Sequence, residues 1–445
     1  MFRFVVRPSR LLIALIALSM LALAACTAQQ PPLSDVADPA GESGDQSQSA
    51  GAESASSGEP ISFAVFGDVA ELNAFEALVA AFEERHPDID IAVQHTASQG
   101  EYRQRLATSF SGGAPPDIFL LNYRRFGQFA GQGVLEPLGP YLEQSELIAA
   151  EDFLEPTIDS FMLDGQLWCI PQNLSSLVVY YNKDLFDAAG VAYPANDWTW
   201  NDFLEVARAL TIDADSDGTP EQYGVGIEPS IFRLAPFVWQ AGGAIVDDPE
   251  NPTRLTLDTP EAQRAFKFFV GLQTEEGVVP DRVAEQAEAS ESRFLNGTLA
   301  MYFNSRRGVP TYRTIESFEW DVAPLPRDVE AAGILHSDGY CLSSRTANKA
   351  DAWTFIEYAN SVEGQTIVAA SGRTVPSLRE VAESEAFLDP TVPPANSRIY
   401  IENTELIRRV PIMSTWVGIE ETAAREIEEA VYGGVSTEEA ARRAQ

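Results

Sequence analysis

From Ile61 onwards, the chain alternates segments patterned as buried β-strands with segments patterned as amphipathic helices. In the first helical segment, apolar residues recur at helical spacing between Leu72 and Phe82. The other segments are strands over 61–66, 89–94 and 117–121 and a helix over 102–110. Strands that alternate with helices predict an α/β fold with a doubly wound, parallel sheet.

The carboxyl ends of the first and third strands predict the rim of a ligand site, because ligands of doubly wound sheets bind beyond those ends. Asp68 follows the first strand, and Asn122, Tyr123 and Arg124 follow the third. Strand order alone therefore makes these four residues candidates for ligand contact.

Length and charge narrow the class of protein. Roughly 385 residues follow the N-terminal region, which is too long for one ordinary core and predicts two lobes. The net charge is −36 and no basic cluster is flanked by stacking aromatics, which argues against nucleic acid as a partner. The three histidines (His86, His95 and His336) lack the paired spacing of a zinc site, and no G-x-S-x-G nucleophile turn is present. These features favour a binding protein over an enzyme. The alternative is a secreted hydrolase whose catalytic pair would be two of the 66 acidic residues.

The N-terminus has the order of a bacterial lipoprotein signal. Three arginines precede an apolar run over 11–25, which is shorter than the roughly 20 residues of a membrane span. Residues 23–26 (LAAC) resemble a lipobox, so residues 1–25 are predicted to be a signal peptide and Cys26 to be diacylated. An ordinary secretory signal cleaved nearby is the alternative. Residues 26–59 are rich in Ser, Ala and Gly and predict a flexible linker. The protein is thus expected outside the cytoplasm, anchored by lipid to the cell membrane.

The segment over 164–200 carries the strongest resemblance to a known family. A turn at Asp164-Gly165 precedes a strand-like run over 174–181, and a helix that Asn182 can cap ends at Gly190. Five motifs follow the family's order along the chain: APPDIF (114–119), GVLEPL (133–138), YNKDLF (181–186), FLNGTLAM (294–301) and PIMSTW (411–416). The chain resembles the family 1 extracellular solute-binding proteins, which are the receptors of sugar-importing ABC transporters.

The resemblance implies a two-lobed periplasmic-binding-protein-like fold of type II, with doubly wound sheets joined by a hinge. It places residues 60–173 in the first lobe and 174–336 mainly in the second. Residues 337–445 would form a hinge crossover, the rest of the first lobe and C-terminal helices that return to the second. It further implies a monomer that captures a carbohydrate by hinge closure, delivers it to the permease subunits of an ABC importer and requires no cofactor. A sensor that presents its ligand to a membrane receptor is an alternative.

The resemblance also implies a set of ligand contacts. Positions that match sugar contacts of the family's maltose-binding member are Asp68, Leu121, Arg124, Arg125, Ser175, Arg307 and Trp416. Three further candidates follow from their place in family motifs: Trp239, Asn304 and Tyr340. A place in the core is the alternative for Trp239. Leu121, Ser175 and Arg307 stand where the maltose-binding member has two aromatics and an acid, which leaves fewer stacking faces and more positive charge.

Four arginines raise the question of the ligand's charge. Arg124, Arg306, Arg307 and Arg373 together would favour an anionic ligand such as a uronate, because arginine pairs bidentately with carboxylate. Ion pairs on the surface of a strongly acidic protein are the alternative for each of them.

Two cysteines remain if Cys26 is lipidated. Cys169 and Cys341 both lie in strand-like segments, and an even pair in an oxidising compartment favours a disulfide. In the family these segments are neighbouring crossovers between the lobes, so the resemblance implies that the two are bonded. Two buried free thiols are the alternative.

One acidic segment has the pattern of half a calcium loop. Asp213, Asp215 and Asp217 occupy positions 1, 3 and 5, and Glu221 occupies position 9, but Gly224 replaces the glutamate of position 12. The segment therefore predicts a structural Ca²⁺ site, with an Asx-rich turn as the alternative.

Overall fold

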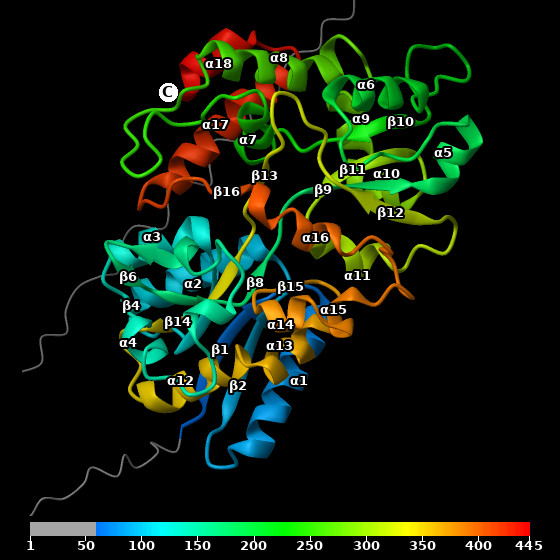
Figure 1. Ribbon diagram of the computed structural model, residues 1–445. Coiled ribbons are helices and arrows are strands. Elements are labelled where there is room, and N and C mark those ends of the chain that lie inside the picture. Colours follow the sequence, from blue (N-terminus) through cyan, green and yellow to red (C-terminus); the bar gives the residue numbers. More distant parts are fainter. Residues whose placement is uncertain (1–58) are drawn as a thin grey trace, which may run out of the picture. The chain divides into compact units, whose positions relative to one another are not determined.

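The computed structural model describes residues 59–445 (Figure 1). The predicted signal peptide, Cys26 and the predicted linker up to residue 58 lie outside the described residues. All described residues belong to one compact unit. Within this part of the chain, no helix combines the length and apolar character that crossing a bilayer requires.

A six-stranded sheet forms the centre of the first lobe. Its strands β1 (Ile61–Phe66), β2 (Ile91–Thr96) and β3 (Ile118–Asn122) pair in parallel, as the alternation predicts. Strand β14 (Asp338–Ser343) runs antiparallel to β3 and also pairs with β4 (Leu135–Glu136) and β7 (Cys169–Pro171). The expectation of parallel pairing is wrong at β14, because the chain returns from the second lobe at the carboxyl edge of the sheet and enters in the opposite direction.

The first helix shows how sequence signals position elements in this lobe. Helix α1 begins after Asp68, whose Oδ1 accepts the backbone N–H of Glu71 at 3.0 Å. It buries an apolar stripe that includes Phe75 and Phe82, and Phe82 meets Phe355 at a centroid distance of 5.1 Å. The helices of this lobe are α1 (Val69–Arg85), α2 (Gln99–Gly112), α3 (Tyr123–Gly131), α4 (Gly139–Leu142), α12 (Lys349–Ala359), α13 (Val362–Ala369) and α14 (Arg379–Ala382).

A four-stranded sheet of order β10-β11-β9-β12 forms the centre of the second lobe. Its strands are β9 (Val178–Asn182), β10 (Tyr223–Gly226), β11 (Leu299–Asn304) and β12 (Trp320–Ala323). A Cβ at Gly224 would lie 2.1 Å from the carbonyl oxygen of Ala207, so only glycine lets β10 approach helix α6 this closely. The helices of this lobe are α5 (Lys183–Ala189), α6 (Trp200–Ala209), α7 (Ile231–Gln240), α8 (Pro260–Thr274), α9 (Arg282–Ala287), α10 (Ser290–Leu295), α11 (Val309–Tyr312), α17 (Trp416–Val431) and α18 (Thr437–Ala444).

Short strand pairs connect the lobes. Strand β8 (Asn173–Leu174) pairs with β15 (Val375–Pro376), and β13 (Gly333–Ile334) pairs with β16 (Ile407–Arg408). The chain returns to the first lobe through β14 and α12, and then crosses again so that α17 and α18 pack on α8. The remaining elements are η1 (Ala150–Asp152), η2 (Asp159–Phe161), β5 (Met162–Leu163), β6 (Gln166–Leu167), η3 (Arg306–Gly308), α15 (Glu385–Leu388), α16 (Ile399–Glu402) and η4 (Thr404–Leu406).

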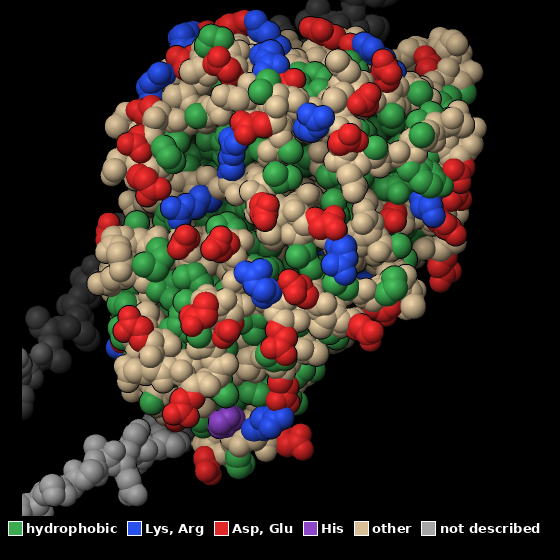
Figure 2. Space-filling model, viewed as in Figure 1, with side chains coloured by type: hydrophobic (Ala, Val, Ile, Leu, Met, Phe, Trp, Pro, Cys, Tyr) green, Lys and Arg blue, Asp and Glu red, His purple; other side chains and the backbone are tan. Residues whose placement is uncertain are grey.

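Cys169 and Cys341 form a disulfide between the paired strands β7 and β14, with their Cα atoms 4.4 Å apart. Both cysteines are fully buried in the first lobe. The bond therefore joins the strand that leaves this lobe to the strand that returns to it. On the outside of the molecule, acidic side chains are spread over the visible face, with lysine and arginine side chains among them (Figure 2).

Candidate functional site

A cavity of about 710 Å³ lies where the carboxyl ends of β1 and β3 meet the hinge strands β8 and β15. The beginnings of helices α1, α2, α3 and α7 contribute to its wall. Strand order pointed to this edge of the sheet. Seven residues singled out from the sequence line the cavity: Asp68, Asn122, Arg124, Arg125, Ser175, Arg307 and Arg373.

Arg373 contacts two carboxylates at the end of β1. Its Nη1 donates to Asp68 Oδ2 at 3.0 Å, and its Nε lies 2.5 Å from Glu71 Oε2. Glu71 is buried, and this burial raises its pKa to about 8 although the positive charge of Arg373 acts in the opposite direction. A Cβ at Gly67, where φ is +140°, would overlap the Glu71 carboxyl group. Glycine at this position therefore allows Glu71 to lie against the end of β1.

Asp338, at the beginning of β14, is a second carboxylate held inside the cavity wall. Asn122 Nδ2 donates to Asp338 Oδ1 at 3.1 Å, and the backbone N–H of Asp338 donates to Asn173 Oδ1 at 3.0 Å. Burial raises the pKa of Asp338, while the hydrogen bonds from Asn122 and Asn173 act in the opposite direction. Amide and carboxyl groups from β3, β8 and β14 thus meet at one point of the wall.

Arg124 connects the two lobes at the cavity. Its Nη1 is hydrogen-bonded to Glu420 of α17, and its Nε donates to Asn122 Oδ1 at 3.1 Å. The guanidinium carbon lies 3.9 Å from the ring centroid of Phe232 in α7. The ring of His336 lies 4.6 Å from the same ring, which is only 6% exposed. Phe232 therefore packs against protein groups and offers little free face for a sugar ring.

The second-lobe side of the cavity carries further positive charge. Arg233 Nη2 lies 3.0 Å from Glu228 Oε2, while the Arg307 Nε donates to Asn304 Oδ1 at 3.4 Å. His336 is buried, which lowers its pKa well below the usual value, and the charges of Arg233, Arg124 and Arg307 act in the same direction. His336 is therefore neutral at physiological pH.

Four predicted contact residues have rings that the structure places in the protein core instead of the cavity. They are Tyr123, Trp239, Tyr340 and Trp416, each 5% exposed or less. The Tyr123 hydroxyl accepts the backbone N–H of Val410 at 3.3 Å. Tyr340 lies two residues further along β14 than Asp338, so its ring reaches below the strand end and packs 5.8 Å from Phe63. Trp239 lies in the last turn of α7, away from the end of that helix that lines the cavity.

Asn304 and Arg306 likewise lie outside the cavity. Asn304 Nδ2 donates to the Tyr312 hydroxyl at 2.7 Å. Arg306 is 1% exposed, and it donates to the carbonyl oxygen of Gly372 at 2.8 Å and to Ser397 Oγ at 2.9 Å. Arg306 therefore connects η3, which follows β11, to the chain at Gly372 and at Ser397. The neighbouring Ser305 lines the cavity.

Sequence reasoning did not identify several residues of the cavity wall: Glu71, Arg103, Asn173, Glu228, Phe232, Arg233 and Glu420. Phe232 and Arg233 follow Ser230, which caps α7 after β10. The rule that ligands bind beyond the carboxyl ends of strands (the strand-end rule), applied to the sheet of the second lobe, would have found them. Glu420 carries no such signal, because it lies in the first turns of α17 far along the chain.

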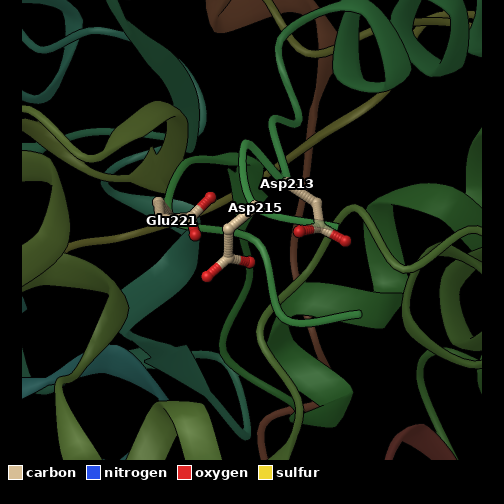
Figure 3. A group of neighbouring side chains, drawn as sticks. All are labelled: Asp213, Asp215 and Glu221. Carbon is tan, nitrogen blue, oxygen red and sulfur yellow. The ribbon is translucent and has the colours of Figure 1, made fainter. Parts of the chain in front are cut away.

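The predicted calcium residues lie on an exposed loop between α6 and β10. The carboxylate oxygens of Asp213, Asp215 and Glu221 lie within 4.8 Å of one another (Figure 3). Asp217 is not part of this group, and its Oδ1 accepts the backbone N–H of Thr219 at 2.8 Å. Carboxylate oxygens of this kind are ligands that Ca²⁺ prefers. None of these residues lines the cavity.

Comparison with known proteins agrees with the motifs and the fold. Residues 67–366 match the family of bacterial extracellular solute-binding proteins. The chain is similar to the maltotriose-binding protein of Pyrococcus abyssi, with 24% identity over 333 residues that cover 72% of this chain and 67% of that protein. Its fold is similar to that of the ABC substrate-binding protein Lmo0181 from Listeria monocytogenes in complex with cycloalternan, with a TM-score of 0.79 and 27% identity over 86% of this chain and 96% of that chain. A maltose-bound MalE3 from T. maritima shares the fold with a TM-score of 0.73 and 20% identity, over 86% of this chain and 97% of that chain. With two lobes, a hinge, a cavity at the strand ends and a matching family pattern, the chain belongs to the bacterial extracellular solute-binding proteins, which bind solutes and are not enzymes.

Proposed function

We propose that this protein is a lipid-anchored, extracytoplasmic receptor that captures a carbohydrate by hinge closure and delivers it to the permease of an ABC importer. The observation that carries the proposal is the cavity of about 710 Å³ between residues of both lobes and the hinge. Its volume lies within the range of roughly 300–1,000 Å³ that is typical of small-molecule sites.

The chemistry of the wall supports a polyhydroxylated ligand. Asn122, Asn173 and Ser175 supply amide and hydroxyl groups, and Asp68 and Asp338 supply carboxylates. Such planar polar groups accept and donate hydrogen bonds to sugar hydroxyls. Proteins similar to this chain are named for maltotriose or were solved with cycloalternan, which also supports a carbohydrate, either a mono- or an oligosaccharide.

Hinge closure follows from where the contacts lie. A ligand in the cavity touches α3 of the first lobe and α7 of the second, so it makes most contacts when the lobes are close together. Binding then shifts the equilibrium towards the closed form. The Arg124–Glu420 pair would form and break with this motion. No cofactor takes part in this cycle, and the protein acts as a monomer.

Anchoring and delivery rest on other features of the chain. Cys26 follows the lipobox-like residues 23–25 and would carry the acyl chains. Docking of the closed form on a two-domain permease would release the ligand for import. A Ca²⁺ ion on the loop of Asp213 would stabilise the second lobe without touching the ligand.

A thermal-shift screen of the purified protein tests the proposal. Neutral oligosaccharides, uronates and polyols are added in turn, and a ligand that binds only the folded state raises the Tm. We expect at least one carbohydrate to raise the Tm and to be recovered unchanged. A carbohydrate that is consumed would favour a secreted hydrolase, and a panel without any shift would contradict carbohydrate binding. Deletion of the gene then separates the two remaining functions. Loss of carbohydrate uptake would identify a transport receptor, and unchanged uptake would favour a sensor.

A further inference from the structure

Six arginines line the cavity, although the chain carries a net charge of −36. Three of them are paired with carboxylates: Arg124 with Glu420, Arg233 with Glu228, and Arg373 with Asp68 and Glu71. The other three are Arg103, Arg125 and Arg307. Within residues 59–445, none of these three forms an ion pair, and the side chains of Arg103 and Arg125 also form no hydrogen bond.

Arg103 and Arg125 lie together on the first-lobe side of the cavity. Arg103 is in the second turn of α2, and Arg125 is in the first turn of α3. Both side chains are half-buried. Burial and the nearby positive charges of Arg103 and Arg124 lower the pKa of Arg125 to about 10, while Glu420 and Glu421 act in the opposite direction. The guanidinium groups of Arg103, Arg124 and Arg125 therefore repel one another. A negative charge between them would relieve this repulsion.

Six acids also line the cavity. Four of them form the ion pairs with Arg124, Arg233 and Arg373: Asp68, Glu71, Glu228 and Glu420. The other two are Asp338, which Asn122 and Asn173 hold at the carboxyl end of β3, and Glu421, which is exposed. Burial lowers the pKa of His336, and the charges of Arg233, Arg124 and Arg307 act in the same direction. Within the described residues, three arginines and two acids of the cavity wall thus form no ion pair.

We infer that the carbohydrate carries an acidic group, a carboxylate or a phosphate, that Arg103 and Arg125 bind at the beginnings of α2 and α3. The inference rests on the proposed function and adds the chemical class of the ligand. A guanidinium group donates two parallel hydrogen bonds to either kind of acidic group. The N-termini of α2, with 14 residues, and α3, with 9, add partial positive charge at the same place.

This assignment differs from the arginines that the sequence suggested. Arg306 is buried outside the cavity, and Arg124 and Arg373 are already paired with acids. A ligand would have to displace Glu420 or Asp68 to reach either of them. Arg103 and Arg125 are available without such an exchange. Binding of the ligand's acidic group should therefore depend on these two residues.

Isothermal titration of the purified full chain with matched sugars tests the inference. The pairs are glucuronate with glucose, digalacturonate with galactobiose, and glucose 6-phosphate with glucose. We expect the acidic member of one pair to bind at least tenfold more tightly than its neutral partner, and high salt to weaken only that member. Which pair responds distinguishes a carboxylate from a phosphate.

Variants then connect the effect to the two arginines. Arg103→Gln and Arg125→Gln should each weaken binding of the acidic sugar by about 10- to 100-fold, the range for a hydrogen bond to a charged group. Arg105→Gln is the matched control, because Arg105 lies on the same helix, is 65% exposed and pairs with Glu101. The Arg105→Gln variant should bind the acidic sugar with the affinity of the wild type.

Two results would overturn the inference. If a neutral sugar binds as tightly as its acidic partner and the Arg103 and Arg125 variants retain full affinity, the carbohydrate receptor stands and its ligand is neutral. If no member of any pair binds, and the wider carbohydrate panel also gives no binding, then the proposed function fails and the inference fails with it. Variants whose circular dichroism spectrum matches the wild type exclude misfolding as the cause of a loss.

Discussion

Removal of the Cys169–Cys341 disulfide should destabilise the protein without affecting its ligand affinity. The bond closes a loop with a sequence separation of 172 residues. In the chain-entropy estimate, such a loop costs the unfolded state about 17 cal/mol/K, or about 5 kcal/mol at 25 °C. Unfolding of roughly 390 residues has an entropy of about 0.8 kcal/mol/K, so the Tm should fall by about 6 °C. Neither cysteine lines the cavity, so the Kd should stay the same.

The double variant Cys169→Ala/Cys341→Ala tests this by differential scanning calorimetry. Both it and its reference protein carry Cys26→Ala, because a third thiol would allow disulfide exchange. A thiol assay on the denatured reference protein should find no free cysteine. A Tm within 1 °C of the reference would refute the loop-entropy argument, and a changed Kd would refute the separation of this bond from the site.

Three further predictions concern other parts of the molecule. The pKa of Glu71 is about 8 in the folded state and exceeds the unfolded value. The free energy of unfolding should therefore fall as the pH rises from about 4.5 to about 8, by at most about 1.4 kcal/mol per pH unit. Urea titrations of Glu71→Gln should show a flatter dependence on pH, and a slope equal to that of the wild type would contradict this prediction. Arg306→Met removes hydrogen bonds to Gly372 and Ser397 and should cost about 2–4 kcal/mol in urea unfolding with ligand affinity unchanged; an unaltered midpoint would show that Arg306 does not stabilise the crossover. Millimolar Ca²⁺ should raise the Tm of the wild type but not of Asp213→Asn/Asp215→Asn, whereas equal Tm values in Ca²⁺ and EDTA would leave the loop as a simple turn.

Local signals were sufficient to predict three helices of this fold, α1, α2 and α5. Helix α8 (Pro260–Thr274) carries signals of the same kind, because Thr259 caps it and Pro260 occupies the first position. Helix α6 likewise begins with a capping box of Thr199 and Asp202. Caps are encoded by adjacent residues, so a single sequence reveals them.

Strand direction and side-chain burial were harder to predict, because both depend on residues far apart in the chain. The antiparallel direction of β14 depends on a crossover that begins in the second lobe. The strand-end rule found Asp68, Asn122 and Arg124 because a helix follows each of these strands directly. Trp239 and Trp416 are in family-like positions, yet their rings pack in the core. An aromatic residue of a helix satisfies either environment, and its sequence neighbours do not distinguish the two.

The proposed function places the carbohydrate in the cavity at the strand ends, and a bulky side chain introduced there tests this placement. Ala97 is exposed and lines the cavity, whereas Ala80 is exposed on α1 and does not. Isothermal titration with the carbohydrate that gives the largest thermal shift compares Ala97→Trp with Ala80→Trp. We predict one ligand per protein for the wild type and for Ala80→Trp, and at least a tenfold weaker Kd for Ala97→Trp. Wild-type affinity in Ala97→Trp, with its fold intact, would show that the ligand binds elsewhere.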